Sequence, residues 1–548
     1  MTLDALASQL PVLPIVIPLL AGAVLLLLST RPARRVAGDD APRASRLATL
    51  LSFAALLAVL ASAAALCVRT ADGSVLAYLS GNWPAPFGIA LAVDRLAAML
   101  LLVTAVVAIA CQLAAGDGLT ARAPRFHALL QFQVAGLDAA FLTADLFNLF
   151  VSFEVLLVAS YALLLLDGNR AAVRNGLQYV VVNLFASALF LLGAALLYGM
   201  LGSLNLADLA LRIAATPAAD RGLLEAGGLL LLLAFGLKAA ALPFGFWLPG
   251  TYGAAPAPVA ALFALMTKVG IYAILRVGTV VFGTAEGGLG TTIGPTLVVV
   301  GLATLALAAL GGLGARGLRS LVAWTICGSA GTLLALVGVG AARSLGAALF
   351  YLPHASFAAA ALMLLGGLVA AARGTPGADE FLARTPLPRA ALLGTAFVAC
   401  ALASAGLPPF SGFVAKAILL DAVRSSPFAT AIWSVVLLAS LGWVIALSRG
   451  ASAMFWKPLA ASADADVRAD GARAAASHDM DRDAGPRFIA PGTLAAIALL
   501  VAAGLVLVAF AAPLATHFEL AGAQLASPVD YRDAVLGRWP VTPGGAPP

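Results

Sequence analysis

Charged residues are scarce in this 548-residue chain. Asp, Glu, Lys and Arg together make up 11% of the sequence, whereas 62% of it is hydrophobic. Soluble globular domains carry roughly 25% charged residues. The apolar residues form continuous runs and do not alternate with polar residues as in the strands of a membrane barrel. Helices are then the structure that satisfies the backbone in lipid, so the sequence predicts an all-α polytopic membrane protein.

Cysteine is also scarce, and no pattern that typically holds a metal or redox group is present. The four cysteines lie in or at the ends of apolar runs without paired spacing: Cys67, Cys111, Cys327 and Cys400. We interpret them as small packing residues. The sequence has no CxxC pair, no histidine pair spaced for haem or a metal, and no GxGxxG after a strand. We therefore expect no cofactor and no metal site.

The apolar runs are long enough to cross a bilayer many times, since one helix needs about 20 apolar residues. We predict about fourteen spans, near residues 10–29, 47–67, 91–115, 128–145, 147–166, 176–200, 224–245, 256–282, 294–314, 318–340, 345–371, 390–418, 428–448 and 491–513. Residues 1–115 would hold the first three helices. The polar segment 458–489 is predicted to be a cytoplasmic loop, and residues 514–548 a short outer tail.

Arginine clusters predict the orientation. The loop after the first span is basic, with Arg31, Arg34, Arg35, Arg43 and Arg46. The flank before that span is acidic, which is not typical of a cleavable signal peptide. By the positive-inside rule the basic loop is cytoplasmic, so the N-terminus is expected outside. Fourteen spans would return the C-terminus to the outside as well.

Lysine is scarce too: the sequence has only Lys238, Lys268, Lys416 and Lys457. Arginine stays protonated, whereas a buried lysine can lose its proton. Ionisable side chains inside the membrane are costly and mark ion or proton pathways by default. We therefore predict that the three lysines inside spans carry protons. Lys457, beside Trp456 at the end of a span, is interpreted as reaching back to the interface.

Acidic residues inside the spans are the expected counter-charges. Glu154 lies about seven residues into its span, where an unpaired carboxylate would be heavily penalised, so we expect a basic partner or a proton. Asp138 is in mid-span and could line a polar path. Asp145, in the turn before the span of Glu154, fits an outer-mouth residue and a helix cap equally well. Asp94, at the start of a span beside Arg95, is interpreted as interfacial.

Prolines accompany two of the lysines. The first group is Lys238, Pro243 and Pro249, and the second is Pro408, Pro409 and Lys416. A proline inside a helix removes a hydrogen bond and breaks the helix. The two segments are about five spans apart, and an odd number of spans inverts the topology. We therefore predict two inverted five-helix bundles, at 128–282 and 294–448, each with one broken helix.

Four segments resemble the antiporter-like membrane subunits shared by Mrp (Pha, Mnh) multisubunit cation/proton antiporters and respiratory complex I. They are FLTADLFNLFVSFEVLLVASYALL (141–164), FGLKAAALPFGFWLPGTYGAAPAPVAALFALMTKVGIYAILRV (235–277), SLVAWTICGSAGTLLALVGVG (320–340) and SAGLPPFSGFVAKAIL (404–419). The likeness covers roughly residues 90–450. Within the family, the sequences of the first two segments are most similar to those of the D-type subunits of the antiporters.

The resemblance implies a proton relay through Glu154, Lys238, Lys268, His354 and Lys416. Asp138, Asp145, Pro243, Pro249, Pro408 and Pro409 are expected to support this relay. Family members often have a histidine in the segment that here reads PFGFWLP, and many have a lysine at the position of Ala359. Hydroxyls such as those of Ser356 and Thr325, or water, would have to bridge these gaps.

The function implied is a proton-translocating subunit of a multisubunit Na⁺/H⁺ or K⁺/H⁺ antiporter in a bacterial inner membrane. Such a chain is a transporter subunit and not an enzyme, with a large A-type subunit and small hydrophobic subunits as partners and no nucleic acid. The alternative is a proton-pumping membrane subunit of an NADH–quinone oxidoreductase or a membrane-bound hydrogenase. A scaffold without transport would not explain why lysine is kept almost only inside the membrane.

Overall fold

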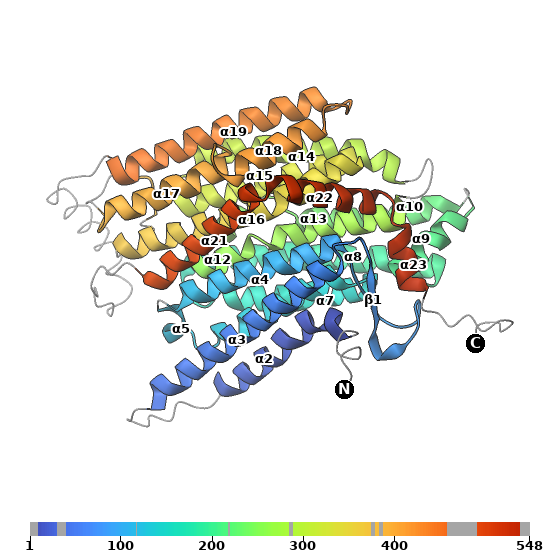
Figure 1. Cartoon of the computed structure of the whole chain (residues 1–548), viewed down its shortest axis with the longest axis horizontal. Coiled ribbons are helices and arrows are strands. Elements are labelled where there is room, and N and C mark those ends of the chain that lie inside the picture. Colours follow the sequence, from blue (N-terminus) through green and yellow to red (C-terminus); the bar gives the residue numbers. More distant parts are fainter. Residues whose placement is uncertain are drawn as a thin grey trace.

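The computed structural model describes residues 9–29, 40–116, 118–217, 220–283, 289–373, 379–382, 387–456 and 490–537, which fold mainly into long helices (Figure 1). The first group is α2 (Leu13–Ser29), α3 (Asp40–Arg69), α4 (Arg95–Ala115), α5 (Leu119–Arg122), α6 (Phe126–Leu142), α7 (Leu146–Leu164), α8 (Arg170–Leu201) and α9 (Leu206–Ala215). The second is α10 (Arg221–Lys238), α11 (Trp247–Ala254), α12 (Ala257–Phe263), α13 (Met266–Val277), α14 (Leu289–Gly314), α15 (Leu318–Val339) and α16 (Ala342–Arg373). The third is α17 (Ala390–Ala405), α18 (Ser411–Ala422), α19 (Ala429–Ala451), α21 (Pro491–Ala509), α22 (Ala511–Ala526) and α23 (Val529–Leu536). Short 3₁₀ or π turns are η1 (Leu10–Val12), η2 (Ser80–Asn82), η4 (Gly278–Phe282) and η5 (Ser452–Trp456).

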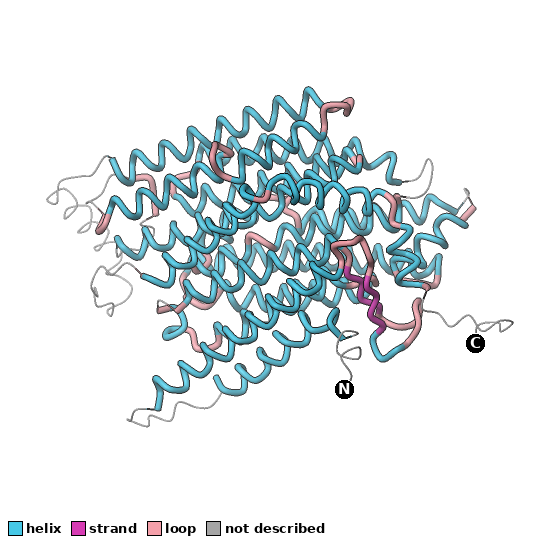
Figure 2. Tube along the Cα trace, in the orientation of Figure 1, coloured by secondary structure: helices cyan, strands magenta, loops and turns pink. Residues whose placement is uncertain are grey.

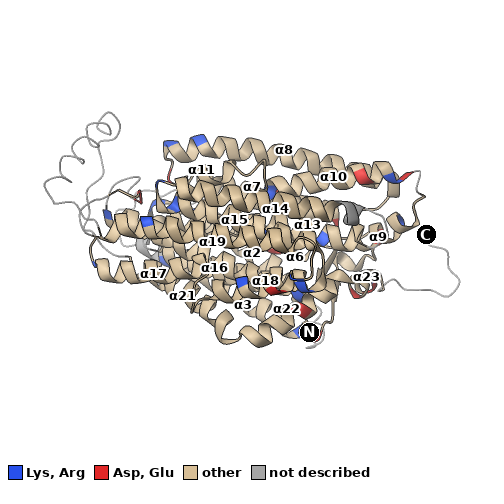
Figure 3. Ribbon diagram, turned by 90° about the horizontal axis from the view of Figure 1, so that it is seen from above, with Lys and Arg blue, Asp and Glu red and all other residues tan. Residues whose placement is uncertain are grey.

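The predicted all-α membrane fold is confirmed. Within the described residues, eleven helices are long and apolar enough to cross a membrane, and α6 and α17 are shorter apolar helices. Each predicted span overlaps one helix or a consecutive set of helices, although the count of fourteen stays a prediction. Charged side chains gather near the helix ends, and few lie along the middle of the helices (Figure 3). The basic loop at 31–39, Lys457 and the loop at 458–489 lie outside the described residues.

The central helix is α16, which packs against α12, α15, α17, α18, α21 and α22 (Figure 1). It is buried along nearly its whole length. Its sequence is rich in alanine and glycine, and small residues let neighbouring helices approach closely in a membrane. Gly346, for example, lies directly against the backbone of Phe518 and Glu519 in α22.

A two-stranded hairpin lies at one end of the helix bundle (Figure 2). Strand β1 (Leu76–Leu79) pairs antiparallel with β2 (Ala90–Val93). This hairpin could not be predicted from the sequence, because β2 is apolar and fully buried and therefore looks like the beginning of the next span. An isolated bridge joins Leu91 to Thr143, so α4 begins and α6 ends at the hairpin end.

The predicted C-terminal tail contains two helices. The last predicted span, 491–513, corresponds to α21, which ends at Ala509. The chain continues into α22, which packs along α16, and Gly522 lies against the backbone of Ala342 and Gly346. Helix α23 follows and contacts α9 and the hairpin. Residues 511–536 therefore belong to the packed body of the protein, while residues 538–548 lie outside the described residues.

Candidate functional site

Two apolar segments break at the predicted prolines. The first break separates α10 from α11 and contains Pro243. The second separates α17 from α18 and contains Pro408 and Pro409. Pro249 instead lies in the first turn of α11, where the backbone N–H has no partner within the helix, so it does not interrupt the helix. Each break exposes the carbonyl end of one half-helix inside the protein.

Lys238 is the last residue of α10 and is buried, with 5% of its surface exposed. Its ammonium has no hydrogen-bond partner among the described residues. The Nζ atom lies over the ring of Phe153, 4.8 Å from the ring centroid. A cation is attracted to an aromatic face and to the carbonyl end of a helix, but neither interaction replaces a hydrogen bond. Lys238 therefore holds its charge through weak, non-directional contacts.

Glu154 is on α7 and accepts a 2.5 Å hydrogen bond from the Ser187 hydroxyl of α8. Lys238 is the expected basic partner of this carboxylate. A salt bridge requires a nitrogen and an oxygen within 4.0 Å. The salt bridges between described residues do not include one between Glu154 and Lys238. The predicted pair is thus not a closed ion pair in this structure.

Lys268 is on α13 and is fully buried. Its Nζ donates to the Ser329 hydroxyl of α15 at 2.8 Å and to the neighbouring Thr267 hydroxyl at 3.3 Å. Ser329 in turn donates to the Ile326 carbonyl of its own helix. Lys268 therefore connects α13 to α15 through neutral oxygen atoms.

His354 and Lys416 lie at the second break. The Nδ1 atom of His354, on α16, is 2.9 Å from the hydroxyl of Ser411, the first residue of α18. The Nζ atom of Lys416 donates to the Ala405 carbonyl at 2.6 Å and to the Ser440 hydroxyl of α19 at 2.8 Å. Ala405 ends α17, so this amine caps the carbonyl end of the first half-helix.

The two supporting aspartates have different surroundings. Asp145 is the N-cap of α7, and its carboxylate accepts from the Asn148 backbone N–H at 2.9 Å. Of the two alternatives for Asp145, the structure thus contains the helix cap. Asp138 is fully buried on α6, and neither of its carboxylate oxygens has a partner among the described residues.

The hydroxyls expected to bridge the relay are bonded within their own helices. Ser356 donates to the Leu352 carbonyl at 2.9 Å, and Thr325 donates to the Val322 carbonyl at 2.7 Å. Each hydroxyl can still accept a hydrogen bond. The described side chains form no continuous hydrogen-bonded chain from Lys238 to Lys416, so water would have to complete one.

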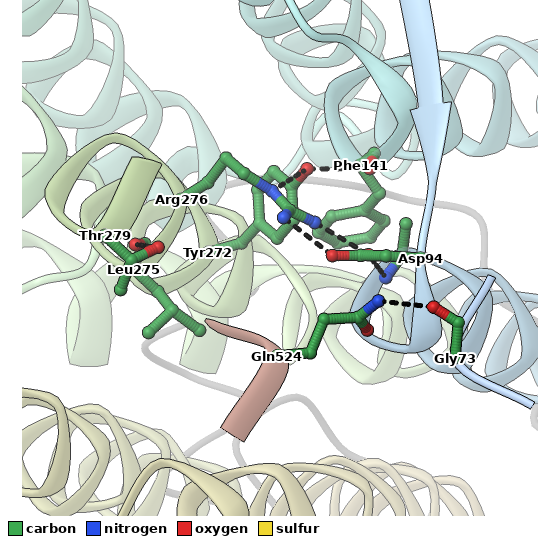
Figure 4. A network of polar contacts seen from close by, with 9 residues as sticks. Gly73, Asp94, Phe141, Tyr272, Leu275, Arg276, Thr279 and Gln524 are labelled. Carbon is green, nitrogen blue, oxygen red and sulfur yellow. Dashed lines mark hydrogen bonds and ion pairs between the residues drawn. The ribbon is translucent and has the colours of Figure 1, made fainter. Parts of the chain in front are cut away.

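Asp94, which the sequence suggested to be interfacial, is buried within the protein with 1% exposure, at the end of the bundle where α4 begins. It caps α4 and forms two hydrogen bonds, of 2.7 and 2.8 Å, to the guanidinium of Arg276 on α13 (Figure 4). Arg276 also donates to Tyr272 and lies over the ring of Tyr531 from α23. This pair was not predicted, because the two residues are far apart in the chain. An arginine deep in an apolar run was the available signal.

Comparisons with known proteins agree with this architecture. A family model described as "NADH:quinone oxidoreductase/Mrp antiporter, TM" matches residues 143–442. The D subunit of a probable K⁺/H⁺ antiporter of Rhizobium meliloti is 40% identical over 82% of this chain and 87% of its own length. The D subunit of a Na⁺/H⁺ antiporter of Bacillus subtilis is 38% identical over 61% of this chain and 67% of its own length. A chain of the Mrp complex from Dietzia sp. superposes with a TM-score of 0.80 at 30% identity, covering 98% of this chain and 100% of that one.

Proposed function

Because this chain belongs to the NADH:quinone oxidoreductase/Mrp antiporter family, we propose that it is a proton-translocating subunit of a multisubunit antiporter that exchanges Na⁺ or K⁺ for H⁺. The observation that carries the proposal is a pair of lysines at the two helix breaks, the buried Lys238 and the partly buried Lys416, with Lys268 and His354 buried in the same protein core. Intramembrane ionisable groups of this kind are costly and mark ion or proton pathways.

In this proposal, Lys238 stores a proton beside Glu154. The ammonium has no hydrogen-bond partner among the described residues, so its charge depends on the Glu154 carboxylate and on the aromatic face of Phe153. A carboxylate that moves closer holds the proton on the amine, and one that moves away releases it. The released proton passes through water to Lys268, then to His354 and Lys416. Each step changes the charge at one group and thereby biases the next group.

The oxygen atoms around the relay suit this role. Lys268 bonds to the hydroxyls of Ser329 and Thr267, and Lys416 bonds to the hydroxyl of Ser440. A hydroxyl can accept from an ammonium, and after rotation it can donate to a neutral amine. The same side chains can therefore solvate either state of each lysine. A buried carboxylate in contact would instead fix the positive charge.

The partners and the placement follow from the same proposal. We expect a large A-type subunit and small hydrophobic subunits to complete the antiporter, because one relative is named as an antiporter subunit and another belongs to an Mrp complex. The chain would reside in a bacterial inner membrane with both termini outside. Arg122 and Arg125 lie between the far ends of α4 and α6, opposite the hairpin, and the positive-inside rule assigns that end to the cytoplasm.

The two predicted five-helix bundles, 128–282 and 294–448, remain part of this proposal. The breaks between α10 and α11 and between α17 and α18 occupy corresponding places in the two segments. Each break has one lysine beside it, although Lys238 precedes its break in the chain and Lys416 follows its break. Each bundle would carry one half of the proton path.

The alternative function, a proton-pumping subunit of an NADH–quinone oxidoreductase or hydrogenase, would use the same buried groups. The test uses everted vesicles from antiporter-deficient cells that express the whole gene cluster. Respiration acidifies the lumen, Na⁺ or K⁺ is added, and a ΔpH-sensitive dye reports proton movement. We expect cation-dependent dequenching in the wild type and its loss in Lys238→Ala and Glu154→Ala, with normal assembly. Wild-type vesicles without any cation response would favour the redox-linked alternative.

A further inference from the structure

A second buried polar cluster joins α3, α4 and α6, apart from the lysine relay. Both ring nitrogens of His127 have polar neighbours. Its Nδ1 atom is 3.0 Å from the Gln112 amide nitrogen, and its Nε2 atom is 3.2 Å from the Thr49 hydroxyl. Ser52 donates to Gln112 at 3.2 Å, and Gln131 donates to the Ser52 carbonyl at 2.9 Å. His127, Gln112, Ser52 and Gln131 are at most 3% exposed. An apolar segment thus contains a continuous chain of side-chain hydrogen bonds.

This cluster continues along one face of α6. Successive helical residues are rotated by about 100°, so His127, Gln131 and Asp138 lie within about 40° of one another around the helix. Asp138 is about 16 Å further along the axis than His127, roughly half the thickness of the hydrocarbon core. The three side chains therefore form a polar stripe from one end of α6 toward the middle of the membrane.

Four oxygen atoms of α6 are buried without a hydrogen-bond partner among the described residues. They are Oε1 of Gln131, Oε1 of Gln133 and both carboxylate oxygens of Asp138. A buried polar atom without a partner is costly, and ordered water is the usual partner where no side chain is within reach. Gln131 and Asp138 lie on the stripe and Gln133 lies on the opposite side of α6, so these oxygens indicate water on both sides of the helix.

Other residues of α6, on the side of the helix away from the stripe, contact the helices of the lysine relay. Gln133 donates from its amide nitrogen to the Met266 sulfur at 3.0 Å, and Met266 begins α13 two residues before Lys268. Gly136 lies directly against Leu156 of α7. Because α6 and α7 are antiparallel, this contact places Asp138 at about the same depth as Glu154. The α6 side chains thus lead from the end with Arg122 and Arg125 to the depth of the relay.

A purely structural cluster would look different at its inner end. The group from Thr49 to Gln131 could simply fasten α3, α4 and α6 together. Asp138, however, bonds to no described residue, so it contributes nothing to helix fastening while its carboxyl remains buried. Because the Asp138 carboxyl is costly to bury and joins no helices, a functional role explains its position better than a structural one.

We propose that this stripe is a proton inlet that runs along α6 from His127, past Gln131, to Asp138 and the Lys268 end of the relay. The inference rests on the proposed transport function. His127 receives protons from the end of the bundle with Arg122 and Arg125. Water along the stripe carries them past the Gln131 amide to the Asp138 carboxyl, and water around α6 carries them on to its opposite side, where Gln133 contacts Met266.

The transport test compares conservative variants in the assembled antiporter. His127→Gln keeps hydrogen bonds to Gln112 and Thr49 but cannot carry a proton at neutral pH. Asp138→Asn keeps the shape of the carboxyl without its acid–base chemistry. We expect each variant to assemble normally and to lower the rate of cation-driven proton movement about tenfold or more. The matched control is Ser62→Ala on α3, whose buried hydroxyl bonds only to its own helix at Val59, and it should transport at the wild-type rate.

A second measurement needs no substitution. Hydroxyl radicals produced by X-ray irradiation oxidise side chains that lie beside water, and mass spectrometry reports the rate for each methionine. Met266, beside Gln133, and Met99, on α4, are both 6% exposed. We expect Met266 in the wild-type complex to be oxidised several times faster than Met99.

The outcomes separate this inference from the proposed function. Equal oxidation of Met266 and Met99 would overturn the proposed water around α6, whatever the transport result. Wild-type rates in both His127→Gln and Asp138→Asn, with Lys238→Ala inactive, would overturn the inlet and leave the lysine relay standing. A wild-type complex without cation-driven proton movement would instead overturn the proposed function, and the inlet with it.

Discussion

At the scale of single residues, the lysines of the candidate relay share one property. No lysine takes part in the salt bridges that join described residues. Lys268 and Lys416 bond to neutral oxygens, and Lys238 bonds to none of the described groups. A closed buried ion pair would lock each proton in place, because breaking it leaves an uncompensated charge at a cost of about 3–5 kcal/mol. The observed surroundings leave each amine free to exchange its proton.

The hydrogen bond from Ser187 should stabilise the charged form of the Glu154 carboxylate. The Ser187 hydroxyl donates to Glu154 at 2.5 Å, and a hydrogen bond to a charged group contributes about 1.5–3 kcal/mol. We expect Ser187→Ala to slow cation-driven proton movement several-fold in everted vesicles without changing the amount of assembled complex. Ser152→Ala is the control, because that hydroxyl on α7 bonds to its own helix at Asn148. Equal rates in the two variants would mean that Ser187 does not act on the carboxylate.

The buried pair of Asp94 and Arg276 should matter for stability. Arg276→Met leaves the Asp94 carboxylate buried without its partner, so we expect a loss of about 3–5 kcal/mol and a lower melting temperature of the purified complex. Adding Asp94→Asn should restore much of the loss, since asparagine still caps α4 and carries no charge. Arg343→Met removes a pair that is at least half exposed and should change stability by less than about 1 kcal/mol. A double variant as unstable as the single one would contradict this account.

At the scale of elements, the broken helices are the feature that positions the site. The break between α17 and α18 brings the Ala405 carbonyl to Lys416 and the Ser411 hydroxyl to His354. Gly406 allows this arrangement in two ways. Its backbone has φ of +82°, and a Cβ atom there would lie 2.7 Å from the Lys416 amine.

Gly406→Ala should therefore damage both the break and the lysine. Alanine strains a backbone with positive φ and also crowds the amine, so we expect lower thermal stability and slower proton movement. Gly199→Ala is the matched control, because Gly199 is helical in α8 and a methyl group added there would meet no neighbouring atom within 4 Å. That change should be neutral or stabilise the protein by up to about 1 kcal/mol. Wild-type stability and transport in Gly406→Ala would refute the requirement for glycine.

Much of the helix layout could be predicted from the sequence, because long apolar runs and prolines act locally. The breaks at Pro243 and at Pro408–Pro409 lie where the prolines indicated. Hydrogen-bond partners could not be predicted in the same way. Asp94 and Arg276 meet only through tertiary packing, and the buried strand β2 has the composition of a membrane helix. The sequence likewise contained His127 and Gln131, but only the packing of α3, α4 and α6 brings them into one cluster.

At the scale of the whole molecule, the proposed function requires both breaks to serve one proton path. Lys268 and His354 lie on α13 and α16, between the helices that carry Lys238 and Lys416 in the chain. The two described ends of the fold, α2 and α23, approach the same side of the bundle as the hairpin (Figure 1). Helix α16 packs against elements from both predicted bundles, including α12 and α18. The molecule is thus one packed body in which a charge in one half can affect the other.

A single path predicts a specific pattern of combined substitutions. Groups that act as one unit show strongly non-additive effects, because removing either group already stops the process. We expect Lys238→Ala and Lys416→Ala each to abolish cation-driven proton movement in everted vesicles, and the double variant to be no worse than either one. Two independent paths would give a different result: each single variant would keep about half of the wild-type rate, and only the double variant would be inactive. Immunoblots of the partner subunits in the same vesicles control for assembly. Each alanine removes a charge from the protein interior and forms no new contact, so we expect both variants to fold.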